Sequence, residues 1–215
     1  YILTCFNTAI KLFKKKKIFG FINFPGAKKT LFKKNNHGIT EFLSKKSGAK
    51  NNEAMLIYNK KLSVSPITTH IPLSKVNKMI SRNKIVKKTK TINNFYKKVL
   101  KKNPKIAVLG LNPHNFSPLK KSEEKIIISR AIKDLLKYKI NVIGPISPDT
   151  SFMFFKKNKI DVIIGMYHDQ VLTPFKALFN FDAINITAGL PYIRISPDHG
   201  VAGNIVGKKK ANPSS

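Results

Sequence analysis

The chain has 215 residues, which is enough for one large or two small domains with a buried core. The apolar fraction of 42% is ordinary, but 41 Lys and Arg residues against 10 Asp and Glu residues give a net charge of +31. The single cysteine, Cys5, excludes an internal disulfide framework and favours a reducing cytoplasm. No apolar run reaches the length of a membrane span, and the first residues lack the features of a signal peptide. We therefore expect a cytoplasmic protein without a membrane partner, and a fragment, because the initiator Met is missing.

Two explanations remain open for the charge. The basic residues are nearly all lysines in short runs, and Asn, Ile and Phe are abundant beside them, which fits a drift in coding composition. Such a charge also draws nucleic acid and phosphorylated small molecules to a surface.

In the first half of the chain the pattern predicts helices separated by short strands. Apolar residues recur at helical spacing in the first segment, and Thr40 can open a second helix. The expected elements are a helix over 1–17, a strand over 18–24, a helix over 40–46, strands over 55–58 and 62–65, and one helix over 75–101.

In the second half strands and helices alternate, which predicts a parallel α/β sheet. The run Lys159–Tyr167 is rich in β-branched residues and has no internal turn former except Gly165, so it reads as a strand buried on both faces. The other expected elements are strands over 105–111, 140–143 and 183–187, helices from Ser122 and after Gln170, and a short helix capped by Thr150. The predicted fold class is α/β with a largely parallel sheet flanked by helices.

Three histidines follow predicted strands, namely His70, His114 and His168. Ligands of open α/β sheets bind beyond the carboxyl ends of the strands. Three neutral imidazoles with open positions suit a divalent cation such as Zn²⁺ or Co²⁺ that also holds a substrate. The alternative is that each histidine is only hydrogen-bonded at its strand end.

Two aspartates, Asp149 and Asp169, also lie at strand ends. They can orient a ligand histidine or take part in proton transfer, and the alternative role is capping the helices that follow.

Lys176 and Arg194 are candidates for holding a phosphate or carboxylate, and Arg194 is the more informative because arginine is scarce here. Asn185 lies within an apolar strand, where its amide needs a partner. The chain contains neither G-x-G-x-x-G nor G-x-x-x-x-G-K-[ST], so no nucleotide cofactor follows from glycine loops.

Taken together, these segments resemble the signatures of the PdxA family, the 4-hydroxythreonine-4-phosphate dehydrogenases of vitamin B6 biosynthesis. The resemblance runs in order through most of the chain from about residue 18 and is far more specific than any one motif. The matching segments are Thr68–Leu73, Gly110–His114, Met166–Gln170, Asn185–Thr187, Gly189–Pro191, Arg194 and Asp198–Gly200.

The resemblance implies an isocitrate/isopropylmalate dehydrogenase-like fold and a homodimer whose active site lies between the subunits. It implies one divalent metal ion (Zn, Co or Mg) held by His70, His114 and His168, with Asp149 and Asp169 close to it. The implied substrate contacts are Thr40, Lys176, Asn185 and Arg194.

The implied reaction is the oxidation of 4-phosphooxy-L-threonine by NAD or NADP, followed by decarboxylation to 3-amino-2-oxopropyl phosphate. The implied domains are a remnant of the amino-terminal domain (1–30), a metal-binding and dimerisation α/β domain (31–205) and the start of a truncated carboxyl-terminal return (206–215). The expected partners are a second copy and a phosphorylated small molecule, with no specific nucleic acid.

The chain departs from the family pattern in two loops. The family's Gly-His-Thr-Glu is Gly38–Glu41 with Ile39 in place of histidine, and its Asn-Pro-His-Ala-Gly-Glu is Asn112–Ser117, which loses a glycine and a carboxylate. Two rival functions therefore stay open. One is a sister dehydrogenase acting on a phosphorylated four-carbon sugar acid, and the other is a non-catalytic basic protein that binds nucleic acid.

Overall fold

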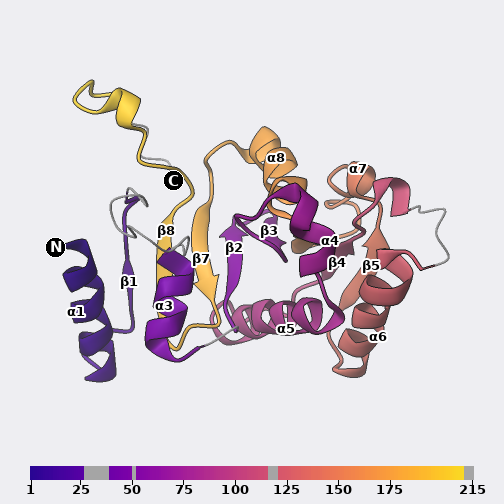
Figure 1. Cartoon of the computed structure of the whole chain (residues 1–215), viewed down its shortest axis with the longest axis horizontal. Coiled ribbons are helices and arrows are strands. Elements are labelled where there is room, and N and C mark those ends of the chain that lie inside the picture. The colour runs from indigo at the N-terminus through magenta and orange to yellow at the C-terminus, as the bar shows by residue number, and fades with distance from the viewer. Residues whose placement is uncertain (27–38, 50–51, 116–120, 211–215) are drawn as a thin grey trace. The chain divides into compact units, whose positions relative to one another are not determined.

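The computed structural model of the chain describes residues 1–26, 39–49, 52–115 and 121–210. The chain forms two compact units (Figure 1). Unit 1 comprises residues 1–57 and 181–215, and unit 2 comprises residues 58–180. The domain boundaries expected at residues 30 and 205 both lie within unit 1, and the implied domains stay a prediction.

The sheet of unit 2 has four parallel strands in the order β3 (Ser63–Pro66), β6 (Val162–Gly165), β4 (Ile106–Leu109) and β5 (Val142–Ile146). Every residue of β3, β4 and β6 is buried. Strands covered on both faces become continuous apolar runs, which is why β4 and β6 are built almost wholly from Ile, Val, Leu and Ala. The parallel sheet and its strand positions confirm the prediction from sequence.

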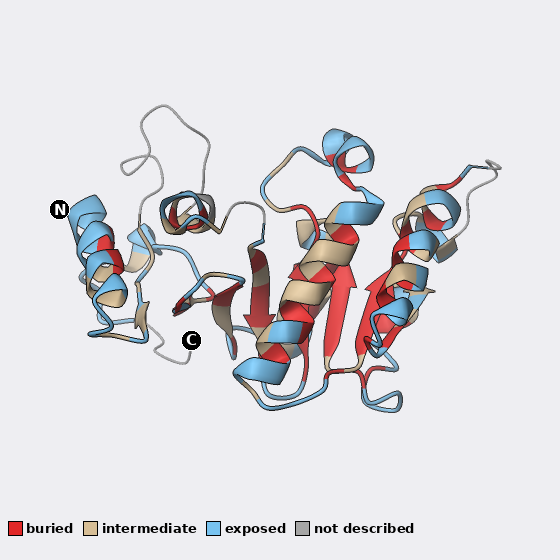
Figure 2. Cartoon of the chain, turned by 90° about the horizontal axis from the view of Figure 1, so that it is seen from below, coloured by how far each residue is buried: buried red, intermediate tan, exposed pale blue. Residues whose placement is uncertain are grey.

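Three longer helices pack around this sheet. Helix α8 (His168–Phe179) packs against β3 and β6, and α6 (Ser129–Lys137) packs against β5 and against α5 (Arg82–Lys98). Seen from below, α5 crosses in front of the buried strands, with buried and half-buried residues along its middle and exposed residues near its ends (Figure 2). Residues of α5 that face the sheet, such as Ile85 and Ile92, are fully buried.

The prediction of a single helix over 75–101 is wrong. The chain instead forms η1 (Leu73–Lys75), the single turn α4 (Val76–Met79) and then α5. The backbone is extended at Ile80 and Ser81, and the Ser81 hydroxyl accepts a hydrogen bond from the Lys84 N–H at 3.2 Å. A serine that caps a new helix interrupts the apolar periodicity without any glycine or proline.

The short helix predicted to follow a Thr150 cap begins earlier. It is α7 (Pro148–Ser151), with Ser147 as N-cap and Thr150 inside the helix. Proline is favoured in the first turn of a helix because its missing N–H has no intrahelical partner there. Two short elements complete the unit, η2 (Pro113–Asn115) and the π-helical turn η3 (Glu124–Ile128), which runs into α6.

Unit 1 contains the first and last elements of the chain. Its strands lie in the order β1 (Gly20–Ile22), β8 (Ile193–Pro197), β7 (Ile184–Ala188) and β2 (Ala54–Tyr58). The β1–β8 pair is parallel and the β7–β8 pair is antiparallel. Helices α1 (Ile2–Lys14) and α3 (Ile39–Ser47) and the turn η4 (Gly203–Ile205) complete the described part of the unit.

One cluster of the unit 1 core combines aromatic and aliphatic side chains. Phe6 and Ile10 of α1 are buried with Leu43 of α3 and with Tyr192, and the ring centroids of Phe13 and Tyr192 are 5.1 Å apart. Helix α1 thus buries the middle of the apolar stripe predicted from its sequence, at Phe6 and Ile10, whereas Ile2 and Leu3 are exposed. None of the helices in the described part of the chain is long and apolar enough to span a membrane.

Candidate active site

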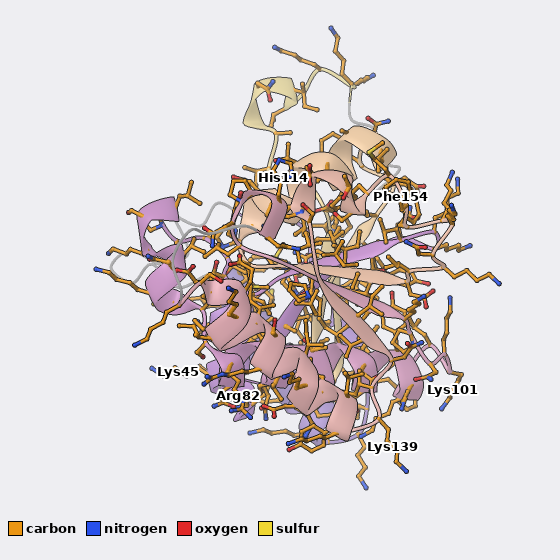
Figure 3. All side chains as sticks on the ribbon, turned by 90° about the vertical axis from the view of Figure 1, so that its right-hand side faces the viewer. Lys45, Arg82, Lys101, His114, Lys139 and Phe154 are labelled. Carbon is orange, nitrogen blue, oxygen red and sulfur yellow. The ribbon has the colours of Figure 1, made fainter. Side chains whose placement is uncertain are left out.

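The carboxyl ends of the four parallel strands of unit 2 meet along one edge, which we call the carboxyl edge. It consists of the segments that follow β3, β4, β5 and β6, namely residues 67–72, 110–115, 147–151 and 166–170. All three predicted metal ligands and both predicted aspartates lie on this edge. Figure 3 shows His114 at one end of the unit, with Lys101 and Lys139 at the opposite end.

Two of the histidines are neighbours. The ring centroids of His70 and His168 are 5.4 Å apart. The segments that carry them are joined because Thr68, just after β3, donates its hydroxyl to the carbonyl of Met166, just after β6, at 2.7 Å. The Thr68 N–H reaches the same carbonyl at 3.1 Å. Because β3 and β6 are adjacent in the sheet, residues distant in sequence come together.

His168 is paired with the aspartate that follows it. Its Nδ1 atom lies 2.7 Å from Asp169 Oδ1, and both residues belong to the first turn of α8. An ionised carboxylate only accepts hydrogen bonds, so Nδ1 donates and Nε2 carries the lone pair of the neutral ring. A carboxylate behind the imidazole is the usual support of a metal-binding histidine.

His114 has the same kind of partner. Its Nδ1 atom lies 3.2 Å from Asp149 Oδ2, and its backbone is left-handed with φ 52°. A hydrogen bond from the Ser147 hydroxyl, helped by the proximity of His114, holds the pKa of Asp149 below its ordinary value. Asp149 is therefore ionised near neutral pH and can orient the His114 ring.

The described residues of one chain bring two of the three predicted ligands together. Within residues 1–26, 39–49, 52–115 and 121–210 no group of three or more His, Cys, Asp or Glu side chains converges on a metal-sized space. The donor set nevertheless fits a divalent cation, because the adjacent imidazoles of His70 and His168 and the third imidazole of His114 share one edge with two carboxylates. The metal itself stays a prediction.

Glu124 lies beside this edge, and its role was not predicted from the sequence. It is 3% exposed, and one carboxylate oxygen accepts hydrogen bonds from the backbone N–H groups of Leu111 and Asn112 at 3.0 and 2.9 Å. The Asn112 side-chain amide donates to both carboxylate oxygens at 3.1 Å. Burial raises the pKa of this carboxyl, but the hydrogen bonds from Asn112 and Leu111 outweigh burial, so the pKa lies below its ordinary value. Glu124 thus anchors the segment that leads to His114.

Gln170 ties the ends of β6 and β4 together. Its Oε1 accepts from the Met166 N–H at 2.6 Å, and its Nε2 donates to the Gly110 carbonyl at 2.8 Å. Both backbone groups belong to buried residues, so the amide satisfies two polar groups that water does not reach. The sequence offered one signal for this role, an amide two residues after His168.

The departure from the family pattern after His114 has a structural correlate at Asn115. Its backbone is left-handed with φ 56°, and its side-chain amide donates to the Pro145 carbonyl at 3.0 Å. Its Oδ1 atom occupies the space beside Gly110, only 1.8 Å from where a Cβ there would lie. An added Cβ at position 110 would therefore displace the Asn115 side chain. Phe116 and Ser117 lie outside the described residues, as does Gly38 of the other departure.

Lys176 is half-buried in the second half of α8. It lies eight residues after His168, or roughly 12 Å along the helix axis. Substrate binding by Lys176 stays a prediction.

The remaining predicted contacts belong to unit 1. Arg194 of β8 is 3% exposed, and its guanidinium donates to Asn23 Oδ1 at 2.7 Å and to the Thr187 hydroxyl at 3.1 Å. Thr40 is half-buried in the first turn of α3. The Asn185 side-chain oxygen is buried and has no hydrogen-bond partner among the described residues. A buried polar atom without a partner is unusual and calls for an explanation, and contact of Asn185 with a substrate stays a prediction.

Comparison with known proteins covers the whole chain. The family model described as "Pyridoxal phosphate biosynthetic protein PdxA" matches residues 1–215. The 4-hydroxythreonine-4-phosphate dehydrogenase of Sulfurihydrogenibium sp. is 43% identical over 97% of this chain and 65% of its own length. The D-threonate 4-phosphate dehydrogenase of Pectobacterium atrosepticum is 38% identical over 83% of this chain and 55% of its own length.

Solved structures agree with these matches. The 4-hydroxythreonine-4-phosphate dehydrogenase of Klebsiella pneumoniae is 34% identical, with a TM-score of 0.83 over 97% of this chain and 64% of that one. The isocitrate dehydrogenase of Methylococcus capsulatus is 10% identical, with a TM-score of 0.57 over 95% of this chain and 67% of that one, a likeness of fold alone. These neighbours confirm the predicted isocitrate dehydrogenase-like α/β fold.

Proposed function

The chain belongs to the PdxA family, and from this membership we propose that it oxidises 4-phosphooxy-L-threonine with NAD or NADP and decarboxylates it to 3-amino-2-oxopropyl phosphate. The chain spans 55% to 65% of the length of the curated relatives named above. The observation that supports the proposal is that three histidines and two aspartates lie along the carboxyl edge of unit 2.

His70, His114 and His168 are the proposed ligands of the divalent cation. When bound, the cation supplies Lewis acidity, which lowers the pKa of a substrate hydroxyl and polarises the ketone that oxidation produces. The chain's own contribution is to place neutral imidazoles at one edge and to fix their orientation. The pairs His114–Asp149 and His168–Asp169 do this through Nδ1, which directs Nε2 away from the carboxylate.

Asp149 and Asp169 have a second possible role in proton transfer. Both side chains are exposed on the carboxyl edge, and the lowered pKa of Asp149 keeps it ionised and able to accept a proton from a bound alcohol. Each of these carboxylates can thus orient its histidine and also accept a proton.

The phosphate and carboxylate of the proposed substrate require cationic and hydrogen-bond-donating side chains. Arg194 offers a guanidinium held in place by Asn23 and Thr187, and Lys176 offers a point charge on α8. Thr40 and Asn185 are the proposed neutral contacts. The nicotinamide of NAD or NADP accepts the hydride, in line with the dehydrogenase names of the relatives.

We propose further that two copies of the chain share the active site. A single chain brings His70 and His168 together, whereas His114 is paired with Asp149 and no third ligand joins the first two within the described residues. A second copy can supply the missing ligand. Sedimentation velocity with added Zn²⁺ should then show a dimer that EDTA weakens, and a monomer with undiminished metal binding would contradict the shared site.

The metal assignment is tested by His168→Ala. Loss of one imidazole should weaken Zn²⁺ or Co²⁺ binding at least 100-fold in isothermal titration calorimetry and abolish turnover. The matched control is Thr173→Ala, an exposed position on the same helix, which should bind metal as the wild type does. Full metal occupancy in His168→Ala would refute the ligand set.

A second candidate function follows from the relative in Pectobacterium atrosepticum, whose name specifies D-threonate 4-phosphate. Both substrates carry a phosphate and a secondary alcohol, so the site described above suits either. Turnover should be measured with each, using NAD and NADP and added Zn²⁺, Co²⁺ or Mg²⁺. We expect the higher kcat/KM with 4-phosphooxy-L-threonine, and the opposite order would favour the second function.

A further inference from the structure

The edge of the unit 2 sheet opposite the candidate active site is strongly basic. We call it the amino edge, because it consists of the segments that precede β3, β4, β5 and β6, namely residues 59–62, 99–105, 137–141 and 156–161. These segments contain ten lysines and one carboxylate, whereas the described segments of the carboxyl edge contain two carboxylates and no lysine.

The lysines of the amino edge are available to bind an anion. All except the half-buried Lys105 are exposed. The one carboxylate, Asp161, already pairs with the Lys102 ammonium group at 2.5 Å and accepts from the Lys105 N–H at 2.9 Å. At this edge the described residues hold no further ion pair, so most of the positive charge is not neutralised by the protein itself.

The backbone brings several lysines to the tips of these segments. Lys101, Lys139 and Lys159 have left-handed backbones with φ values of 54°, 54° and 51°. Figure 3 shows Lys101 and Lys139 projecting at the end of the unit remote from His114. Four strands about 4.8 Å apart make the edge about 14 Å wide.

One aromatic side chain lies among these cations. Tyr138 stands between Lys137 and Lys139, is 58% exposed, and has the Lys90 ammonium group 3.6 Å from its ring centroid. Cations beside an exposed aromatic ring are the combination that binds single-stranded nucleic acid, the cations at the phosphates and the ring against a base. An anionic lipid surface would be held by lysines alone and would not require the ring.

We propose that the amino edge is a binding surface for the phosphate backbone of single-stranded nucleic acid, without preference for sequence. This function is additional to the proposed dehydrogenase activity, because it uses the opposite ends of the same four strands. It needs no residue of the carboxyl edge, so either proposal can fail without the other.

The first test is binding of a fluorescein-labelled 20-nucleotide poly(U) strand, followed by fluorescence anisotropy at increasing NaCl concentration. A variant with five lysines of the amino edge replaced by glutamine should bind at least 10-fold more weakly. The slope of the logarithm of the binding constant against the logarithm of the NaCl concentration should become less steep by up to about 3.5, because each phosphate contact contributes about 0.7. The substitutions are Lys60→Gln, Lys101→Gln, Lys139→Gln, Lys157→Gln and Lys159→Gln.

The matched control removes the same charge from exposed lysines elsewhere on unit 2. It should lose less than 3-fold in affinity, because net charge alone acts weakly at a distance beyond the Debye length. Equal losses in the two variants, or no binding by the wild type, would overturn the proposal. The control substitutions are Lys75→Gln, Lys78→Gln, Lys121→Gln, Lys125→Gln and Lys133→Gln.

Tyr138→Ala separates nucleic acid from a lipid surface. Loss of base stacking should weaken poly(U) binding about 5- to 100-fold while leaving the salt slope unchanged. Binding to phosphatidylserine vesicles should not respond to this substitution. Unchanged poly(U) binding together with tight vesicle binding would overturn the proposal in favour of an anionic membrane. Circular dichroism of each variant checks that the fold is retained.

Discussion

The two edges of the unit 2 sheet differ in how their residues are held. At the carboxyl edge, Gln170 bonds backbone groups of buried residues, and Thr68 joins two neighbouring strand ends. Beside it, Glu124 bonds backbone groups of the half-buried Leu111 and Asn112. At the amino edge the lysines extend into solvent, and Asp161 is the one carboxylate among them. The same four strands thus end in a closely bonded network on one side and in loosely held charges on the other.

This difference indicates where the chain tolerates change. Side chains that satisfy buried backbone groups cannot be replaced without leaving those groups unpaired, at a cost of about 1 to 3 kcal/mol each. Exposed lysines do not satisfy buried backbone groups, so their replacement leaves no such group unpaired. Substitutions should therefore destabilise the protein at the carboxyl edge and be neutral or favourable for stability at the amino edge.

The largest effect is expected at Gly165, the last residue of β6. An added Cβ would lie 2.5 Å from Val171 Cγ1 and 2.8 Å from Gln170 Oε1. Gly165→Ala should lower the free energy of unfolding by about 3 kcal/mol, because α8 or the β6 end must shift. Urea denaturation measures the change. Gly203→Ala, where a Cβ would meet nothing within 4 Å, serves as control and should change it by less than about 0.5 kcal/mol.

A smaller loss is expected from Glu124→Gln, about 2 kcal/mol at pH 7, because the amide has no charge and its NH2 group faces the Asn112 side-chain amide where Oε2 accepted a hydrogen bond. The pKa of Glu124 is lowered in the folded state, so its contribution is full above the unfolded pKa and is lost as the pH falls through the folded pKa. The difference from wild type should therefore shrink as the pH falls below about 4.3.

Glu123→Gln is the matched control for this prediction. Glu123 is half-buried and accepts one hydrogen bond, from the Asn112 amide at 3.0 Å. We expect a loss of about 0.5 to 1 kcal/mol. A gap between wild type and Glu124→Gln that is constant from pH 7 to pH 3 would contradict the role assigned to the ionised carboxylate.

The smallest effect, and a favourable one, is expected at Lys139. The Ile140 N–H donates to the Leu135 carbonyl and the Lys139 N–H to the Leu136 carbonyl, which is the Schellman ending of α6 with Lys139 in the left-handed position. Glycine is the usual residue there because it has no Cβ to clash. Lys139→Gly should raise the unfolding free energy by about 1 kcal/mol.

Lys137→Gly provides the comparison two residues earlier. Lys137 is the last residue of α6, so glycine there should instead cost about 0.5 to 1 kcal/mol. Thermal unfolding, monitored by circular dichroism, shows whether each substitution raises or lowers stability. A loss of stability in Lys139→Gly would show that the lysine is not strained.

The strands were predictable because their residues are of one kind. β4 and β6 are runs of Ile, Val, Leu and Ala with few alternatives to a buried strand. The break between α4 and α5 was missed because Ser81 lies among polar residues where a cap and a solvated helix position look alike. Helix ends were also hard to predict where a lysine, rather than the usual glycine, takes the left-handed position after the helix.

The candidate site was predictable as a set of residues but not as an arrangement. His70, His114 and His168 each follow a strand, which the sequence reveals. Glu124 was missed because its carboxylate bonds to residues 12 and 13 positions earlier, a distance over which no local pattern connects them. The pairing of His114 with Asp149 likewise joins the ends of two different strands.

The sequence by itself determined which segments become strands and that histidines and aspartates stand at their ends, because hydrophobic periodicity acts locally. Only the tertiary structure decided the order β3–β6–β4–β5 and hence that His70 and His168 are neighbours whereas His114 faces Asp149. The physical reason is that the backbone hydrogen bonds of a parallel pair are the same whichever strands form it. The packing of the whole unit, rather than any single segment, therefore selects the partners.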